Sequence, residues 1–264
     1  MIGDPPGFGA DPSFFDLIRK MGVEPLGGAS APGGGEPLPV VSPHGTTVVA
    51  LCFADGVVMA GDRRAVEGYS IADNRMDKVF QADEHSVVGI AGVAGQAIEM
   101  VRLFQTELEH YEKVEGDELS LEGKANRLAQ MLRASFPLVV QGLVVVPIYA
   151  GYDLGRGEGR IFRYDAIGGR YEETDYNATG SGSRDAKASL KKRWRPDLER
   201  QAAVEAVVES LVDAGEADTA TAGPDPVRGV YPSVYLVTKE GVAEVPSDEV
   251  KAAFEAMLGR RENA

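Results

Sequence analysis

Two adjacent threonines, Thr46 and Thr47, open the first strand-like run of the chain, directly after Gly45. A threonine hydroxyl is a weak nucleophile near neutral pH and needs an adjacent base to become reactive. An N-terminal threonine carries that base itself, because its α-amine has a reference pKa of about 7.7 to 8.0 and is partly neutral at physiological pH. Such an amine exists at Thr46 only if the Gly45–Thr46 bond is cut. The pattern therefore predicts cleavage at that bond by attack of the Thr46 hydroxyl on its own preceding peptide.

The segment in front of Thr46 has the composition of a leader. Residues 1–45 hold 8 of the 15 prolines and 10 of the 32 glycines, a composition that cannot close a core. Residues 11–22 contain apolar side chains at helical spacing, which predicts a short docking helix built on Phe14, Leu17, Ile18 and Met21. We therefore interpret residues 1–45 as a propeptide removed by self-cleavage, and residues 46–264 as one catalytic domain with a flexible C-terminal tail.

The composition of the whole chain excludes several classes of function. The net charge of −14 and the lack of a basic run disfavour a nucleic-acid partner and an anionic membrane surface. Cys52 is the single cysteine, so no internal disulfide forms, and neither a signal peptide nor a membrane-spanning run is recognisable. These features predict a cytoplasmic protein. The three histidines lack the spacing of metal ligands, so we expect neither a metal nor another cofactor.

The remaining pattern predicts the elements that must position the chemistry. Apolar runs at 46–53 and 57–61 flank an Asp-Gly turn and predict a β-hairpin, and residues 85–92 predict another strand. Two helices follow, with apolar stripes at Ala97, Val101, Phe104, Leu108 and Tyr111 and at Leu121, Ala125, Leu128 and Leu132. Further strands, two more helices, a hairpin and a final helix complete the chain. This order predicts sheets enclosed between helical layers.

Several ordered motifs extend this interpretation. They read HGTTVVAL, GVVMAGDRRA, MDKVF, GIAG, GSGSRDAKASLKK and DTATAGPDPVRG along the sequence. Together they resemble the catalytic β-subunit of the 20S proteasome, of the actinobacterial type, over about residues 11–258. The resemblance implies an α+β fold, the four-layer αββα sandwich of N-terminal-nucleophile hydrolases, with two antiparallel sheets between helical layers. It also implies a threonine endopeptidase.

The resemblance implies specific roles for residues of the motifs. Thr46 corresponds to the nucleophile, and Asp62 and Lys78 correspond to its charged partners. The backbone N–H of Gly92 corresponds to the oxyanion donor. A polar group that orients the α-amine and a water molecule corresponds to Ser181, Asp218 and Thr221.

The resemblance also places a pocket for the substrate side chain that precedes the cut. Its implied lining is uncharged throughout and consists of Ala65, Val66, Met76, Ile90, Ala94 and Ile98. An uncharged wall favours apolar side chains, because a charged one would be left without a partner. We therefore expect chymotrypsin-like specificity.

The implied partners are those of the family's particle. They are six further copies in a seven-membered β-ring, α-subunits in outer rings of a four-ring α7β7β7α7 particle, an ATPase ring that acts through the α-ring, and unfolded, often pupylated, protein substrates. Two alternatives stay open from the residues alone: an N-terminal-nucleophile amidase that acts on a small amide, and a non-catalytic ring subunit. Singly, Thr46, Asp62 and Lys78 could be a strand opening, a turn acid and a surface amine, and Cys52 is interpreted as a core residue.

Overall fold

Strand β1 (Thr47–Phe53) is apolar on both of its faces. Side chains alternate across a strand, so Val49 and Leu51 point one way, and Val48 and Ala50 point the other. The first pair packs in a core beneath helices, and the second pair packs in a core between two sheets. The long apolar run in the sequence therefore corresponds to a strand that is buried from both sides.

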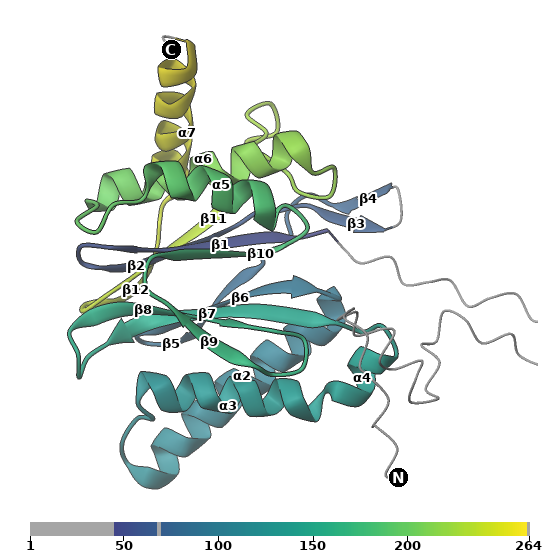
Figure 1. Cartoon of the computed structure of the whole chain (residues 1–264), viewed down its shortest axis with the longest axis vertical. Helices are drawn as coiled ribbons and strands as arrows, with labels where there is room; N and C mark the ends of the chain where they lie inside the picture. The colour runs from purple at the N-terminus through teal and green to yellow at the C-terminus, as the bar shows by residue number, and fades with distance from the viewer. Residues whose placement is uncertain (1–44, 68–69, 263–264) are drawn as a thin grey trace, which may run out of the picture.

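The computed structural model describes residues 45–67 and 70–262, and the docking helix expected within residues 11–22 lies outside them. Two five-stranded antiparallel sheets lie face to face (Figure 1). The first has the order β10-β1-β2-β11-β12 and adds to β1 the strands β2 (Gly56–Gly61), β10 (Tyr176–Gly180), β11 (Ser233–Thr238) and β12 (Gly241–Glu244). The second runs in sequence order and contains β5 (Val79–Asp83), β6 (Ser86–Gly92), β7 (Val145–Asp153), β8 (Glu158–Tyr164) and β9 (Arg170–Glu173).

Helices cover the outer face of each sheet (Figure 1). The second sheet is covered by α2 (Ala94–Glu115) and α3 (Leu121–Ala134), and α4 (Phe136–Val140) follows at the end of α3. The first sheet is covered by α5 (Ser183–Arg193) and α6 (Arg200–Ala217), and α7 (Ser247–Glu262) packs against α6. The predicted stripes of α2 and α3 are buried, except that Tyr111 is 39% exposed.

The predicted αββα sandwich is thus confirmed, as are the hairpin of β1 and β2 and the order of the main elements. The sequence patterns do not predict the two-stranded ribbon of β3 (Ala65–Glu67) and β4 (Ser70–Asp73). They also do not predict strands β5, β9 and β10 or helix α4. These elements are short, and β4 is exposed throughout, so no alternation of buried and exposed positions marks them. Within 45–67 and 70–262, none of the helices combines the length and the apolarity needed to cross a bilayer.

Candidate active site

Thr46 lies directly before β1, where the ends of three strands meet. It is 6% exposed, and its carbonyl oxygen accepts a hydrogen bond of 3.0 Å from the backbone N–H of Ser181. The next residue, Thr47, pairs with Gly180 of β10, and its carbonyl oxygen accepts the N–H of Asp62 at 3.1 Å. The backbone at Thr46 is therefore fixed by residues that are distant in the sequence.

Gly45 is held against the loop that follows α6. A Cβ atom added to Gly45 would lie 1.7 Å from the Cβ of Ala220 and 2.7 Å from its Cα. No side chain fits in that space without moving the backbone of the loop. Glycine at this position is therefore required by close approach of two backbone segments.

Lys78 and Asp62 form a buried ion pair beside the Gly45–Thr46 peptide. The distance between Lys78 Nζ and Asp62 Oδ1 is 2.7 Å, and the two side chains are 2% and 0% exposed. Lys78 Nζ also donates to the carbonyl oxygen of Gly45 at 3.4 Å and to the carbonyl oxygen of Arg64. One ammonium group thus contacts both the carboxylate and the peptide bond that is predicted to be cut.

The carboxylate of Asp62 is fully satisfied by hydrogen bonds. Besides Lys78, Oδ1 accepts the N–H of Thr47 at 2.8 Å, and Oδ2 accepts the N–H groups of Arg64 at 3.0 Å and Ala222 at 3.1 Å. Four donors stabilise a charge that would otherwise be costly to bury. Asp62 therefore ties the start of β1, the end of β2 and the loop after α6 together.

Burial is the largest influence on Lys78, and it disfavours the charged amine. Asp62 opposes this effect through its charge and its hydrogen bond, but the net result is a pKa of Lys78 below its ordinary value of 10.5. The Lys78 amine is thus easier to deprotonate than an exposed lysine.

A second polar group contains three residues predicted for the site. The hydroxyls of Ser181 and Thr221 both donate to Asp218 Oδ2, the latter at 2.6 Å, and the N–H of Ala220 donates to Oδ1 at 3.1 Å. Burial raises the pKa of Asp218, but these hydrogen bonds outweigh it and the pKa is lowered. The structure therefore brings Ser181, Asp218 and Thr221 together around an ionised carboxylate.

Thr47 also belongs to this polar group, and the sequence analysis did not predict its participation. Its Oγ1 accepts the N–H of Gly182 at 3.0 Å and lies 2.6 Å from the Oγ1 of Thr221. Because the Thr221 hydroxyl donates its proton to Asp218, the Thr47 hydroxyl must be the donor to Thr221. The sequence carries no signal for this role, since a threonine in a strand is ordinarily only a β-branched residue.

An apolar hollow lies in front of Thr46. Four residues of the predicted substrate pocket line it, namely Ala65, Met76, Ile90 and Ala94. Ala91 and Ala97 also line it and were not predicted. Val66 and Ile98 do not lie in its wall; Ile98 lines an adjacent hollow that also contains Met76. The structure thus assembles most of the predicted apolar wall beside the predicted nucleophile.

Gly92 also lines this hollow and has a φ of +120°. A Cβ at Gly92 would lie 2.0 Å from the carbonyl oxygen of Val144, so a larger residue is excluded by packing alone. Its role as an oxyanion donor stays a prediction.

Comparison with known proteins agrees with this arrangement. The model of the family described as proteasome subunit matches residues 42–226. The chain belongs to the proteasome subunit family. Residues 42–226 contain every predicted site residue, and the resemblance predicted from the motifs is thereby confirmed.

Three bacterial relatives of this proteasome subunit are each described as proteasome subunit beta. The protein of Acidimicrobium ferrooxidans is 59% identical over 203 residues, which cover 77% of this chain and 74% of the relative. The protein of Streptomyces griseus is 52% identical over 252 residues, or 94% of this chain and 88% of the relative. That of Acidothermus cellulolyticus is 53% identical over 254 residues, or 94% and 87%.

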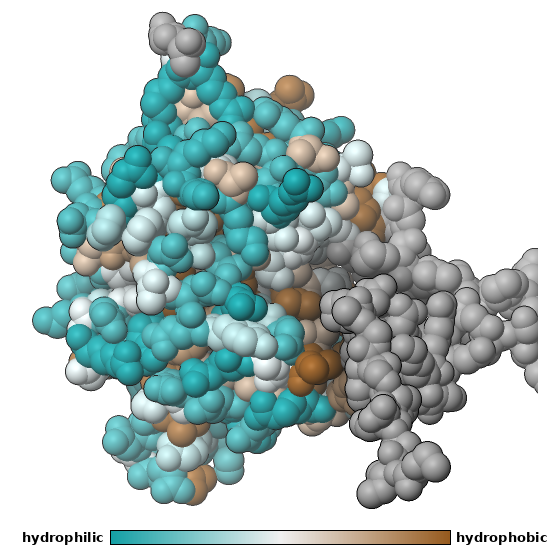
Figure 2. Space-filling view, in the orientation of Figure 1, coloured by the Kyte–Doolittle hydropathy of each residue, from teal (hydrophilic) through white to brown (hydrophobic). Residues whose placement is uncertain are grey.

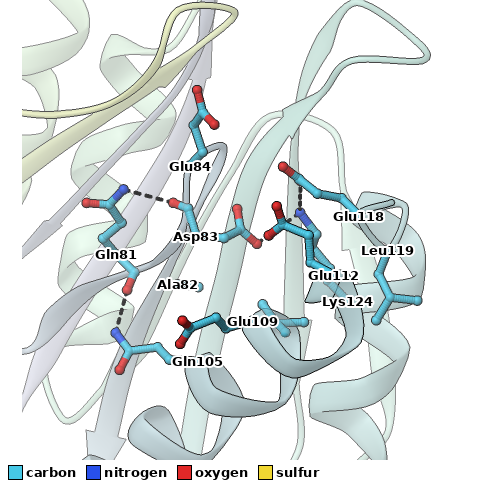
Figure 3. A pocket seen from close by; sticks show the side chains of 11 residues that line it. Gln81, Ala82, Asp83, Glu84, Gln105, Glu109, Glu112, Glu118, Leu119 and Lys124 are labelled. Carbon is cyan, nitrogen blue, oxygen red and sulfur yellow. Dashed lines mark hydrogen bonds and ion pairs between the residues drawn. The ribbon is translucent and has the colours of Figure 1, made fainter. Parts of the chain in front are cut away.

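Two other features of this proteasome subunit resemble functional sites, but burial explains the first and ion pairing explains the second. Burial raises the pKa of Cys52 to about 12, which makes its thiol a poor nucleophile and agrees with the expected core role. A separate hollow lies between the end of β5 and helices α2 and α3 (Figure 3). It is rimmed by carboxylates, and Lys124 forms ion pairs there with Asp83 and Glu118.

Proposed function

We propose that this chain is the catalytic β-subunit of a proteasome core particle, a threonine endopeptidase whose nucleophile is Thr46. The observation that carries the proposal is the position of Lys78. Its ammonium group is 2.7 Å from Asp62 and 3.4 Å from the carbonyl oxygen of Gly45, the oxygen of the peptide bond that must be cut. A buried cation at that place can stabilise an oxyanion.

Self-cleavage would proceed by attack of Thr46 Oγ1 on the carbonyl carbon of Gly45. The Gly45 oxygen gains negative charge in the tetrahedral intermediate, beside the Lys78 ammonium. The C–N bond then breaks, the Thr46 nitrogen takes the proton from the hydroxyl, and Gly45 is held as an ester on Thr46. Water hydrolyses the ester and releases residues 1–45 with a free carboxylate. The amine and hydroxyl of Thr46 are left free.

The mature enzyme would repeat this chemistry on a substrate. The α-amine of Thr46 accepts the hydroxyl proton, and the oxygen attacks the substrate carbonyl. The amine then passes that proton to the substrate nitrogen, the C–N bond breaks, and an acyl ester remains on Thr46 as the new amine end leaves. The N–H of Gly92 would donate to the oxyanion. Asp218, with Ser181 and Thr221, would orient the α-amine and the water that hydrolyses the ester.

We infer that the enzyme prefers apolar residues before the cut. The wall of the hollow in front of Thr46 is mostly apolar and includes Ala65, Met76, Ile90 and Ala94. Lys78 also borders the hollow, but its ammonium is already paired with Asp62, so a charged substrate side chain would find no free partner there. Peptides with leucine or tyrosine before the cut should be hydrolysed faster than matched peptides with arginine or aspartate. Equal rates for the four peptides would contradict this part of the proposal.

The assembly would follow the family. Seven copies form a β-ring, two β-rings stack between rings of α-subunits, and an ATPase ring feeds unfolded, often pupylated, proteins inward in the cytoplasm. The description of the relatives as proteasome subunit beta supports the β-ring position. Enclosure inside the particle suits a nucleophile that cuts almost any unfolded chain, because substrates are then selected by whether they can enter the particle and not by their sequence.

The decisive experiment compares Thr46→Ala with Thr106→Ala, a substitution of an exposed threonine on α2. Each variant is assembled with its α-partner, and intact mass and hydrolysis of a fluorogenic peptide are measured. Thr46→Ala should keep residues 1–45 and lose hydrolysis, whereas Thr106→Ala should begin at Thr46 and remain active. Peptide hydrolysis by Thr46→Ala at the wild-type rate would refute the proposed nucleophile.

A further inference from the structure

Helix α4 carries only apolar side chains, FPLVV, yet none of its residues is buried. It borders a hollow of about 360 Å³ whose apolar lining we name the α2–α4 face: Met100, Leu103, Met131, Ala134 and Leu138. Leu103 is 53% exposed. In Figure 2, where most of the visible surface is hydrophilic, brown residues gather toward the side on which Figure 1 places α4. Within this face Met131 is buried at 8% exposed, and the other four side chains are half-buried or exposed. Apolar surface that stays partly exposed in this way often marks a binding site.

The α2–α4 face lies close to the point where the leader joins the described chain. Gly45 and Ala94, the first residue of α2, line the same hollow in front of Thr46. A helix rises 1.5 Å per residue, so Leu103 lies roughly 14 Å along α2 from Ala94. A chain that runs back from Gly45 therefore starts at the same end of α2 as the face.

We propose that residues 13–21 of the leader dock on the α2–α4 face as an amphipathic helix in the precursor. Phe14, Leu17, Ile18 and Met21 recur at helical spacing and supply the apolar stripe. About 23 residues separate Met21 from Gly45, and an extended chain of that length reaches ~75 Å. The tether is therefore long enough to place the stripe on the face without strain.

Charge also fits this occupant. Residues 13–21 carry two bases, Arg19 and Lys20, against one acid, Asp16. The hollow is lined by two acids, Glu99 and Glu107, and one base, Arg127. Glu107 is paired with Arg127, but Glu99 is exposed and has no ion-pair partner among residues 45–67 and 70–262. Arg19 or Lys20 of the docked segment would supply one.

The tether favours the chain's own leader over a second copy. A covalent tether of this length would hold the segment at a local concentration of roughly the millimolar range, well above the micromolar concentration of free chains in an ordinary assay. The docking does not depend on cleavage at Gly45–Thr46. It concerns only the chain before cleavage.

Disulfide trapping in the full-length Thr46→Ala chain tests the proposal. Met21→Cys is combined with Gln130→Cys, an exposed position on the rim of the hollow, or with Leu154→Cys as the control. Leu154 is 59% exposed in the turn between β7 and β8, at the far end of the sheet from α4 (Figure 1). Cys52 competes poorly, because burial raises its thiol pKa to about 12. The 21–130 pair should close within one chain at least ~10-fold faster than the 21–154 pair, since docking raises the local concentration.

Substitutions in the leader separate docking from mere proximity without disturbing the folded body. Leu17→Asn should reduce closure of the 21–130 pair to the rate of the control pair, whereas Glu24→Asn, outside the stripe, should leave it unchanged. Equal closure rates for the two pairs, or fast closure that persists in Leu17→Asn, would overturn the proposal. A disulfide between two chains, with a yield that rises with protein concentration, would overturn it in favour of a second copy. Failure of the proposed cleavage is read separately, from the intact mass of the wild-type particle.

Discussion

The part of the chain that the structure describes holds two buried lysines near opposite ends of β5, the first strand of the second sheet, and they differ in the number of carboxylates that pair with them. Lys78, directly before β5, has one carboxylate partner, Asp62, and two backbone carbonyl partners. Lys124 lies beyond the other end of β5 and has two carboxylate partners, Asp83 at 3.0 Å and Glu118 at 2.7 Å (Figure 3). Both amines are almost fully buried, at 2% and 5% exposed.

This difference reverses the direction of the pKa shift. Burial is the largest influence on both amines and lowers the pKa of each. At Lys78 the Asp62 carboxylate does not offset burial, the positive charge of Arg64 lowers the pKa further, and the pKa stays below 10.5. At Lys124 the two carboxylates outweigh it, and the pKa rises above 10.5. A buried cation with incomplete compensation can still interact with charge that develops nearby, whereas a doubly paired one only holds elements together.

The largest difference should follow from removal of each amine. Lys78→Ala should slow both leader removal and peptide hydrolysis by ~100-fold or more, because an oxyanion loses its cation. Lys124→Ala should leave both steps within a few-fold of wild type. Time courses of intact mass and peptide hydrolysis measure the two effects. Normal processing in Lys78→Ala would show that its role is misassigned.

Lys78→Ala should remain folded, because three backbone N–H groups still donate to Asp62. Circular dichroism of the variant checks this condition. An unfolded Lys78→Ala chain would make its kinetic loss uninformative, and Lys78→Arg then provides the alternative.

Arginine at each position forms the second test. The guanidinium of Lys78→Arg is larger, planar and always charged, so it cannot reproduce the contacts of a compact amine with Gly45, Asp62 and Arg64. We expect a loss of ~10-fold to 100-fold in peptide hydrolysis. Lys124→Arg faces two carboxylates, a geometry that guanidinium accepts well, and should retain the wild-type rate. Equal losses of peptide hydrolysis in Lys78→Arg and Lys124→Arg would show that the two sites tolerate arginine equally, which would contradict the proposed difference between them.

The sequence points to Lys78 but not to Lys124 as a candidate site residue. Lys78 and Asp62 each look ordinary alone, and they are singled out by motifs that resemble those of the proteasome β-subunit. The apolar run of β1 and the stripes of α2 and α3 predict the scaffold that positions them. Lys124 sits in the first turn of α3 and looks like an ordinary charged residue of a helix surface. Its burial depends on how α3 approaches β5. The role of the Thr47 hydroxyl is likewise not predictable from local sequence, because its partner Thr221 lies in a loop that is distant along the chain.

Removal of one carboxylate beside Lys124 should have a smaller effect, on the stability of the fold. Glu118→Gln leaves Lys124 with Asp83 alone, which reproduces the single pairing of Lys78. The side chain of Glu118 is 36% exposed, so the free energy of unfolding at neutral pH should fall by only ~1 kcal/mol or less. Urea unfolding of the variant measures it, with Glu109→Gln as a matched control, since Glu109 lines the same hollow but its ion-pair partner among the described residues is the exposed Lys113. A loss as large in Glu109→Gln would show that the effect is general charge removal.

The smallest expected effect is a shift in the pKa of each amine, measured by pH titration with NMR detection of lysine side chains labelled with ¹³C at Cε. The midpoint of Lys78 should fall below 10.5 and that of Lys124 above it, and Lys78→Arg and Lys124→Arg assign the two signals. For Lys124 the raised pKa means that its stabilising contribution is complete below pH 10.5 and is lost as pH rises through the folded-state pKa. For Lys78 the sign is opposite, because the cost of holding the charged amine is present below its folded-state pKa and is relieved as pH rises through it toward 10.5. In Glu118→Gln the titration midpoint of Lys124 should move down toward that of Lys78. An unchanged midpoint would mean that Asp83 alone determines the pKa of Lys124. The number of carboxylates would then not explain why the two pKa values shift in opposite directions.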